Sequence, residues 1–147
     1  MADPGILTED DRVELIEGEI VDMPPVGSLH AGNVNRLNNL FVGRLSGHAI
    51  VSVQNPIHLG LYSAPQPDIA LLKPRADYYA RAHPEPKDIL LVVEVSDATL
   101  PYDGEVKLPL DARSSIPEVW IVNLVDHRLE VYWEPSPEGY QRQAHYQ

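Results

Sequence analysis

The feature that most constrains the fold is a run of apolar residues at 89–95 that does not alternate between apolar and polar positions. Such a strand is buried on both faces and belongs at the centre of a sheet. Glu94 interrupts this run, and Asp68 lies near the start of a second apolar run at 67–72. An ionised carboxylate beside a dry core is costly unless it is paired, hydrogen-bonded or bound to a cation. These two acids are therefore the first candidates for function.

The rest of the chain predicts an α/β fold, with a mixed central sheet flanked by helices and an antiparallel hairpin at each end. The N-terminal hairpin spans 12–23 and turns at Glu17 and Gly18. A helix is expected from Ser28, as its N-cap, to about Ser46, with Gly47 ending it. Further elements are expected as extended segments at 48–59 and 67–73, a loop at 74–88, a helix at 102–114, a buried strand at 118–123, and a final pair at 128–133 and 139–145.

The segments 89–95, 102–114 and 118–123 form a strand-helix-strand unit, which predicts two parallel neighbouring strands. Pro109 is expected to kink the helix, because proline lacks the amide donor for the carbonyl four residues earlier. The carboxyl end of the first strand then faces the helix that follows it, the place where α/β sheets bind ligands.

Composition limits the class of protein. A chain of 147 residues with 44% hydrophobic content suits a single domain, 1–147, with one core. The absence of cysteine excludes disulfides, thiolate zinc sites and cysteine nucleophiles. We expect a cytoplasmic protein, since no apolar stretch has the length of a membrane span and the N-terminus has no signal pattern. The formal charge of −11 opposes general nucleic-acid binding.

Asp68 and Glu94 are 26 residues apart on consecutive strands, so their carboxylates can converge on one hard cation. Magnesium takes oxygen ligands and keeps several waters, so two or three carboxylates suffice. The alternative is that both acids are ordinary strand-end residues, solvated or paired with Lys73 or Arg75.

Lys107 follows Glu94 by thirteen positions and lies in the predicted crossover helix. Its ammonium could reach back over the strand end, where it would orient or deprotonate a water and stabilise a pentacovalent phosphate. The alternative is an exposed helix lysine that pairs with Asp103 or Asp111 at helical spacing.

Glu14 alternates with Val13 and Leu15 in the hairpin, so it is either a third acid near a metal or part of a solvated face. His30 shares a helical stripe with Val34, which favours a buried or capping histidine over contact with phosphate. The histidines do not have the spacing of metal ligands, and the chain has no serine-hydrolase elbow. It also has no glycine-rich phosphate loop, so nucleotide cofactors are not expected.

Several segments resemble the Uma-type family of predicted endonucleases, within the PD-(D/E)XK nuclease superfamily. The matching segments run in order from about residue 8: Glu14-Leu15-Ile16-Glu17-Gly18-Glu19-Ile20, Pro65-Gln66-Pro67-Asp68-Ile69-Ala70, Leu91-Val92-Val93-Glu94-Val95-Ser96, Val106-Lys107-Leu108-Pro109-Leu110 and Ile116-Pro117-Glu118-Val119-Trp120-Ile121-Val122. The resemblance also implies that the chain is shortened at both ends.

The resemblance implies roles for individual residues. Asp68 and Glu94 would hold Mg²⁺, with Mn²⁺ as a possible substitute, and Glu14 would complete the acidic cluster. The usual motif has lysine at position 96, where this chain has Ser96, so Lys107 would replace that lysine from the helix. His30 matches a family histidine, and Ser96 and His30 are expected near the substrate or behind the catalytic residues.

Two functions from different classes follow. The first is a metal-dependent endonuclease that hydrolyses DNA phosphodiester bonds, expected as a homodimer and without a membrane partner; hydrolysis of another phosphoester is a weaker variant of it. The second is a catalytically inactive relative that serves as an interaction or dimerisation module. The −11 charge, Ser96 and the shortened ends favour the second, in which exposed aromatic residues would contact a partner: Tyr62, Tyr78, Tyr79 and Trp133.

Overall fold

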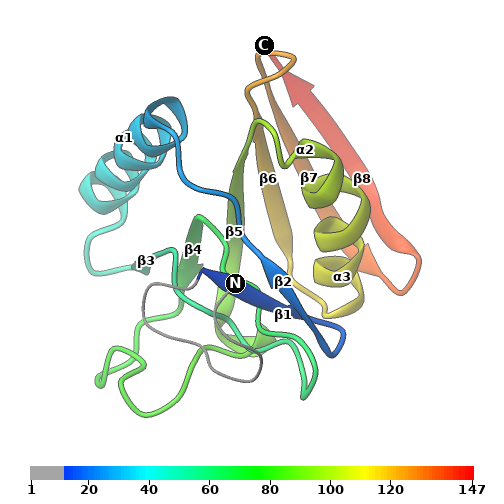
Figure 1. Ribbon diagram of the computed structural model, residues 1–147. Helices are drawn as coiled ribbons and strands as arrows, with labels where there is room; N and C mark the ends of the chain where they lie inside the picture. The colour runs from blue at the N-terminus through cyan, green and yellow to red at the C-terminus, as the bar shows by residue number, and fades with distance from the viewer. Residues whose placement is uncertain (1–11) are drawn as a thin grey trace.

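The computed structural model describes residues 12–147, and its main element is a six-stranded sheet in the order β3-β4-β5-β6-β7-β8 (Figure 1). Strand β5 pairs parallel with β6, and the other neighbouring strands are antiparallel. The predicted mixed sheet is thus confirmed, with 89–95 inside it. The strands are β3 (Ile50–Val53), β4 (Ile69–Leu72), β5 (Ile89–Ser96), β6 (Glu118–Asn123), β7 (Arg128–Ser136) and β8 (Gly139–Tyr146).

The two faces of the sheet have separate hydrophobic clusters. Odd-numbered residues of β4 and β5, such as Ile69 and Val93, pack with Val34 and Phe41 of helix α1 (Ser28–Leu45). Even-numbered residues, such as Ala70 and Val92, pack with Ile16 and Leu110 on the opposite face. Because strand side chains alternate with period 2, Asp68 and Glu94 belong to this second, even-numbered face.

The N-terminal hairpin forms its own two-stranded sheet, from β1 (Val13–Ile16) and β2 (Glu19–Asp22). The turn lies at Glu17 and Gly18 as predicted, and both residues have a positive φ. Glu14 and Ile16 are the buried residues of β1. The hairpin therefore packs on the even-numbered face of the main sheet and directs Glu14 inward.

The crossover helix is divided into three parts: α2 (Leu100–Tyr102), a π-helical turn η2 (Asp103–Lys107) and α3 (Leu108–Arg113). Pro109 is the second residue of α3, so its missing amide falls where the π-helical turn gives way to α-helix. Both end residues of η2, Asp103 and Lys107, are buried. A short 3₁₀ turn, η1 (Pro86–Asp88), precedes β5.

Some boundaries differ from the sequence predictions. Gly27, rather than Ser28, is the N-cap of α1, and no side chain caps that helix. Only four residues of the segment 48–59 form a strand, because the chain leaves the sheet after Val53. Strand β6 is not fully buried: its residues alternate between buried and half-buried. Within residues 12–147, no helix combines the length and hydropathy of a membrane span.

Candidate active site

Asp68 and Glu94 lie at the same end of the sheet, because β4 and β5 are antiparallel and Ile69 is opposite Val93. Their backbones and side chains are linked reciprocally. The amide of Asp68 donates to Glu94 Oε1 at 3.0 Å, and the amide of Val95 donates to Asp68 Oδ2 at 2.8 Å. Neither acid pairs with Lys73 or Arg75 among the described residues. The two carboxylates are therefore fixed beside each other by the sheet itself.

Lys107 points into the protein and is only 5% exposed. Its Nζ lies 2.7 Å from Glu14 Oε2 and 2.5 Å from Glu94 Oε2. The contact with Glu14 has hydrogen-bond geometry, whereas Glu94 Oε2 has a close ion pair but no aligned donor. The alternative of an exposed helix lysine is therefore wrong. The structure brings Lys107 to Glu94 across 13 positions of sequence and to Glu14 across 93.

Glu14 is 6% exposed, so it is not part of a solvated hairpin face. Besides Lys107, its Oε2 accepts a 2.7 Å hydrogen bond from the backbone amide of Gln66. The side chain of Gln66 donates to the carbonyl of Val13 at 3.0 Å. These two hydrogen bonds help to attach the hairpin to the segment before β4 and hold the Glu14 carboxylate against Lys107.

His30, in the first turn of α1, contacts Asp68: its Nε2 lies 3.1 Å from Oδ2. This hydrogen bond raises the pKa of His30, and partial burial opposes the rise. The other ring nitrogen, Nδ1, is buried and has no hydrogen-bond partner among residues 12–147. His30 therefore braces the Asp68 carboxylate from the start of α1.

Asp103 is a buried member of the site that the sequence analysis treated only as a possible partner of Lys107. Its Oδ2 accepts hydrogen bonds from Ser96 Oγ at 2.6 Å and Thr99 Oγ1 at 2.8 Å. Ser96 has no exposed surface, so the geometry places it behind the pocket, where it orients Asp103. Asp103 and Lys107 are four residues apart, and this spacing could have predicted that both lie on the same face of the helix.

The site contains more buried negative than positive charge. Burial raises the pKa of Glu94 well above its usual range, although the nearby Lys107 ammonium opposes this shift. Burial lowers the pKa of Lys107, but attraction to Glu94, Glu14 and Asp103 outweighs it and raises the pKa overall. Burial also raises the pKa of Asp103. One lysine and one histidine face four carboxyl groups, and the raised pKa values of Glu94 and Asp103 mean that the site disfavours their ionised forms. A cation bound beside them would favour ionisation.

The carboxylates of this site suit an ion such as magnesium, which keeps several water ligands, better than an ion that is enclosed by protein ligands. In residues 12–147, no three His, Asp or Glu side chains converge as a ready-made metal cage. Magnesium is typically bound through one or two carboxylates plus waters and substrate phosphates. Glu94 and the adjacent Asp68 would provide two such carboxylates.

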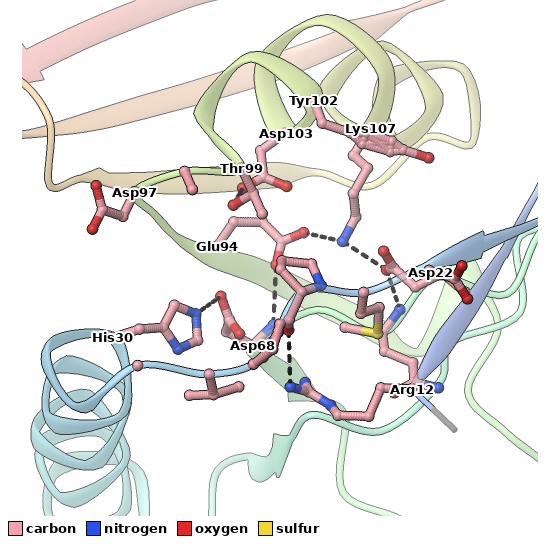
Figure 2. A pocket seen from close by; sticks show the side chains of 18 of the residues that line it. Arg12, Asp22, His30, Asp68, Glu94, Asp97, Thr99, Tyr102, Asp103 and Lys107 are labelled. Atoms are coloured by element: carbon pink, nitrogen blue, oxygen red, sulfur yellow. Dashed lines mark hydrogen bonds and ion pairs between the residues drawn. The ribbon is translucent and has the colours of Figure 1, made fainter. Parts of the chain in front are cut away.

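These residues line a pocket of about 410 Å³ (Figure 2). One wall is the chain between β2 and α1, and the opposite wall is the start of the crossover helix, including Tyr102. Arg12 lies at the pocket and donates from Nη1 to the carbonyl of Pro24 at 3.3 Å. The sequence analysis missed Arg12, because nothing in its spacing links it to the motif acids.

Asp111 of α3 is a buried carboxylate that does not line the pocket. Burial raises its pKa from 3.8 to about 7, against the attraction of Lys107. A folded-state pKa above the unfolded value makes folding less favourable as pH rises from about 4 to 7. Asp111→Asn should therefore stabilise the protein by about 2–4 kcal/mol at pH 8, where the full cost applies.

Urea denaturation of the Asp111→Asn variant and the wild type at pH 5 and pH 8 checks this expectation. The advantage of the variant should grow by about 2 kcal/mol between the two pH values. An advantage that is equal at both would show that the Asp111 carboxylate is not held in a costly ionised form.

Comparison with known proteins agrees with the fold. The architecture is that of a nuclease-like protein: a crystal structure of a putative nuclease belonging to DUF820 from Anabaena variabilis matches with a TM-score of 0.74 and 14% sequence identity, covering 95% of this chain and 79% of that chain. A family model, Uma2, described as "Putative restriction endonuclease", matches residues 4–147. The chain therefore belongs to the Uma2 family. No curated protein matches.

Proposed function

We propose that this protein is a metal-dependent endonuclease that hydrolyses DNA phosphodiester bonds. The observation that carries the proposal is the buried contact of Lys107 with both Glu14 and Glu94, beside Asp68, in one pocket. A buried ion pair of this kind is a poor source of stability, since apolar residues of similar size often do as well. Its position at a concave site points instead to chemistry. Family membership and the nuclease-like fold support the same conclusion.

Asp68 and Glu94 would hold the cation, with Glu14 assisting directly or through water. A bound Mg²⁺ would polarise the phosphate and lower the pKa of a water ligand. Mn²⁺, another hard cation that prefers oxygen ligands, is the expected substitute.

Lys107 would act as a donor. Its ammonium has three protons, of which one is donated to Glu14, while Glu94 Oε2 forms an ion pair with it at 2.5 Å. A remaining proton is available to orient the attacking water or to stabilise the negative charge of the pentacovalent phosphate. His30 would keep Asp68 in its orientation, and Ser96 and Thr99 would do the same for Asp103.

The second candidate function is an inactive module for interaction or dimerisation. It is favoured by the formal charge of −11 and by exposed apolar side chains such as Leu61, Tyr62 and Tyr78. The buried Lys107 argues against it, because an inactive module has no need to bury a lysine among carboxylates.

A nicking assay tests the proposal. Purified protein and its Asp68→Asn variant are incubated with supercoiled plasmid and with single-stranded DNA in Mg²⁺, Mn²⁺ or EDTA at low salt. The wild type should nick DNA only with metal, and the variant should lose this activity by at least about 100-fold. A folded wild-type protein that nicks no DNA, or a variant that nicks as fast as the wild type, would contradict the proposal.

A further inference from the structure

The charged residues are distributed very unevenly along the chain. The 45 residues from 23 to 67 contain none of the 22 acidic residues, and they include Arg36 and Arg44. The remaining residues contain all 22 acidic and nine basic side chains, a formal charge of −13. The overall charge of −11 therefore conceals one positively charged segment.

Helix α1 lies within this segment and exposes most of its surface. Only Val34 and Phe41 are buried in its 18 residues. The exposed side chains include Asn35, Arg36, Asn39 and Arg44. Within residues 12–147, neither arginine forms an ion pair. Arginine and asparagine side chains are common donors to phosphate oxygens, so this face offers hydrogen bonds without repulsion.

The position of α1 links this face to the pocket. His30, in its first turn, contacts Asp68, and the rest of the helix extends away from the pocket over the odd-numbered face of the sheet (Figures 1 and 2). An 18-residue helix is about 27 Å long, which matches about eight base pairs of duplex at 3.4 Å each. By contrast, the hairpin and crossover walls of the pocket present Asp22, Asp97 and Asp103. A polyanion approaching from α1 avoids these acids.

We infer that the exposed Asn and Arg face of α1 binds the phosphate backbone of duplex DNA and leads one strand to Asp68 and Glu94. This inference rests on the proposed function and adds the surface on which the substrate docks. Contacts to phosphate position a duplex without reading its sequence. The binding should therefore be salt-dependent and largely independent of sequence.

The test compares two double variants with the same change in charge. Arg36→Gln with Arg44→Gln alters α1, and Arg81→Gln with Lys87→Gln alters exposed residues of the loop between β4 and β5. That loop lies at the opposite end of β5 from Glu94. Binding to a fluorescent 20-base-pair duplex is measured in EDTA between 25 and 200 mM KCl, so that cleavage plays no part.

The α1 variant should bind about 10- to 100-fold more weakly than the wild type, and the slope of log K against log salt should fall by about two. The loop variant should bind as the wild type does. Equal weakening in both variants, unchanged binding in the α1 variant, or no duplex binding by the wild type at 25 mM KCl would overturn the inference. Such unchanged binding would instead assign the α1 face to a protein partner.

Nicking by the same proteins keeps the two proposals separate. If the wild type does not nick DNA but the α1 variant loses duplex binding, the docking surface stands and the endonuclease proposal fails. If the wild type nicks with Mg²⁺ and the α1 variant binds and nicks normally, the endonuclease proposal stands and the docking surface on α1 fails.

Discussion

Replacing Glu94 with glutamine should reduce metal-dependent DNA cleavage by about 1,000-fold while the protein stays folded. A bound metal contributes several kcal/mol of charge stabilisation, and each 1.4 kcal/mol corresponds to a factor of ten in rate. Glutamine keeps the shape of the side chain but removes the charge that would hold the cation. Folding should tolerate the change, because burial already disfavours the ionised form of Glu94.

The measurement is the single-turnover rate on supercoiled plasmid in saturating Mg²⁺, with folding checked by circular dichroism. Glu130→Gln is the matched control, because Glu130 is also a buried strand carboxylate but does not line the pocket. It is held by Asn123, Arg128 and Tyr132. A Glu94→Gln rate within tenfold of the wild-type rate would contradict the proposed role of Glu94 in holding a metal and favour the inactive module.

The sequence predicted the part of the site that depends on local patterns. Asp68 and Glu94 could be placed together because both interrupt apolar runs of consecutive strands, and period-2 alternation then determines which face they share. The same alternation predicted that Glu14 points to the opposite side of β1 from Val13 and Leu15. It could not predict which side of β1 is buried, because that depends on how the hairpin packs against the main sheet.

The contacts that complete the site are non-local or depend on an irregular helix. Lys107 reaches Glu14 across 93 positions, a separation for which local spacing carries no information. The π-helical turn that buries both Asp103 and Lys107 has no clear sequence signature beyond the nearby Pro109. Helical spacing suggested that these two residues pair with each other, whereas Asp103 accepts hydrogen bonds from Ser96 and Thr99.

The net charge of a whole chain can mislead about the charge of one of its surfaces. A value of −11 opposes nucleic-acid binding only if the charge is spread evenly. Here several acids are buried in the pocket, among them Glu14, Asp68, Glu94 and Asp103, and α1 contains none. The field that DNA would meet therefore depends on the face that it approaches.

Replacing Lys107 with methionine should destabilise the fold by about 3–5 kcal/mol at pH 7, since removing one partner leaves buried carboxylates without compensation. Methionine has a similar length, so the loss reports charge rather than a cavity. Glu14 and Glu94 would then stay ionised at a cost or take up protons. Because the orphaned acids would have raised folded-state pKa values, the destabilisation should be smaller at pH 5 than at pH 7.

Urea denaturation of Lys107→Met measures the effect, with the exposed Lys87→Met as the matched control. Adding Glu94→Gln to Lys107→Met should recover at least about half of the lost stability, because it removes one of the two unpaired charges. A loss below about 1 kcal/mol, or no recovery in the double variant, would mean that the Lys107 contacts are not a coupled buried network. Coupling in this cycle would show that the buried Glu94 carboxylate depends on the Lys107 cation beside it, so that a cation in this pocket lowers the free energy of the ionised form.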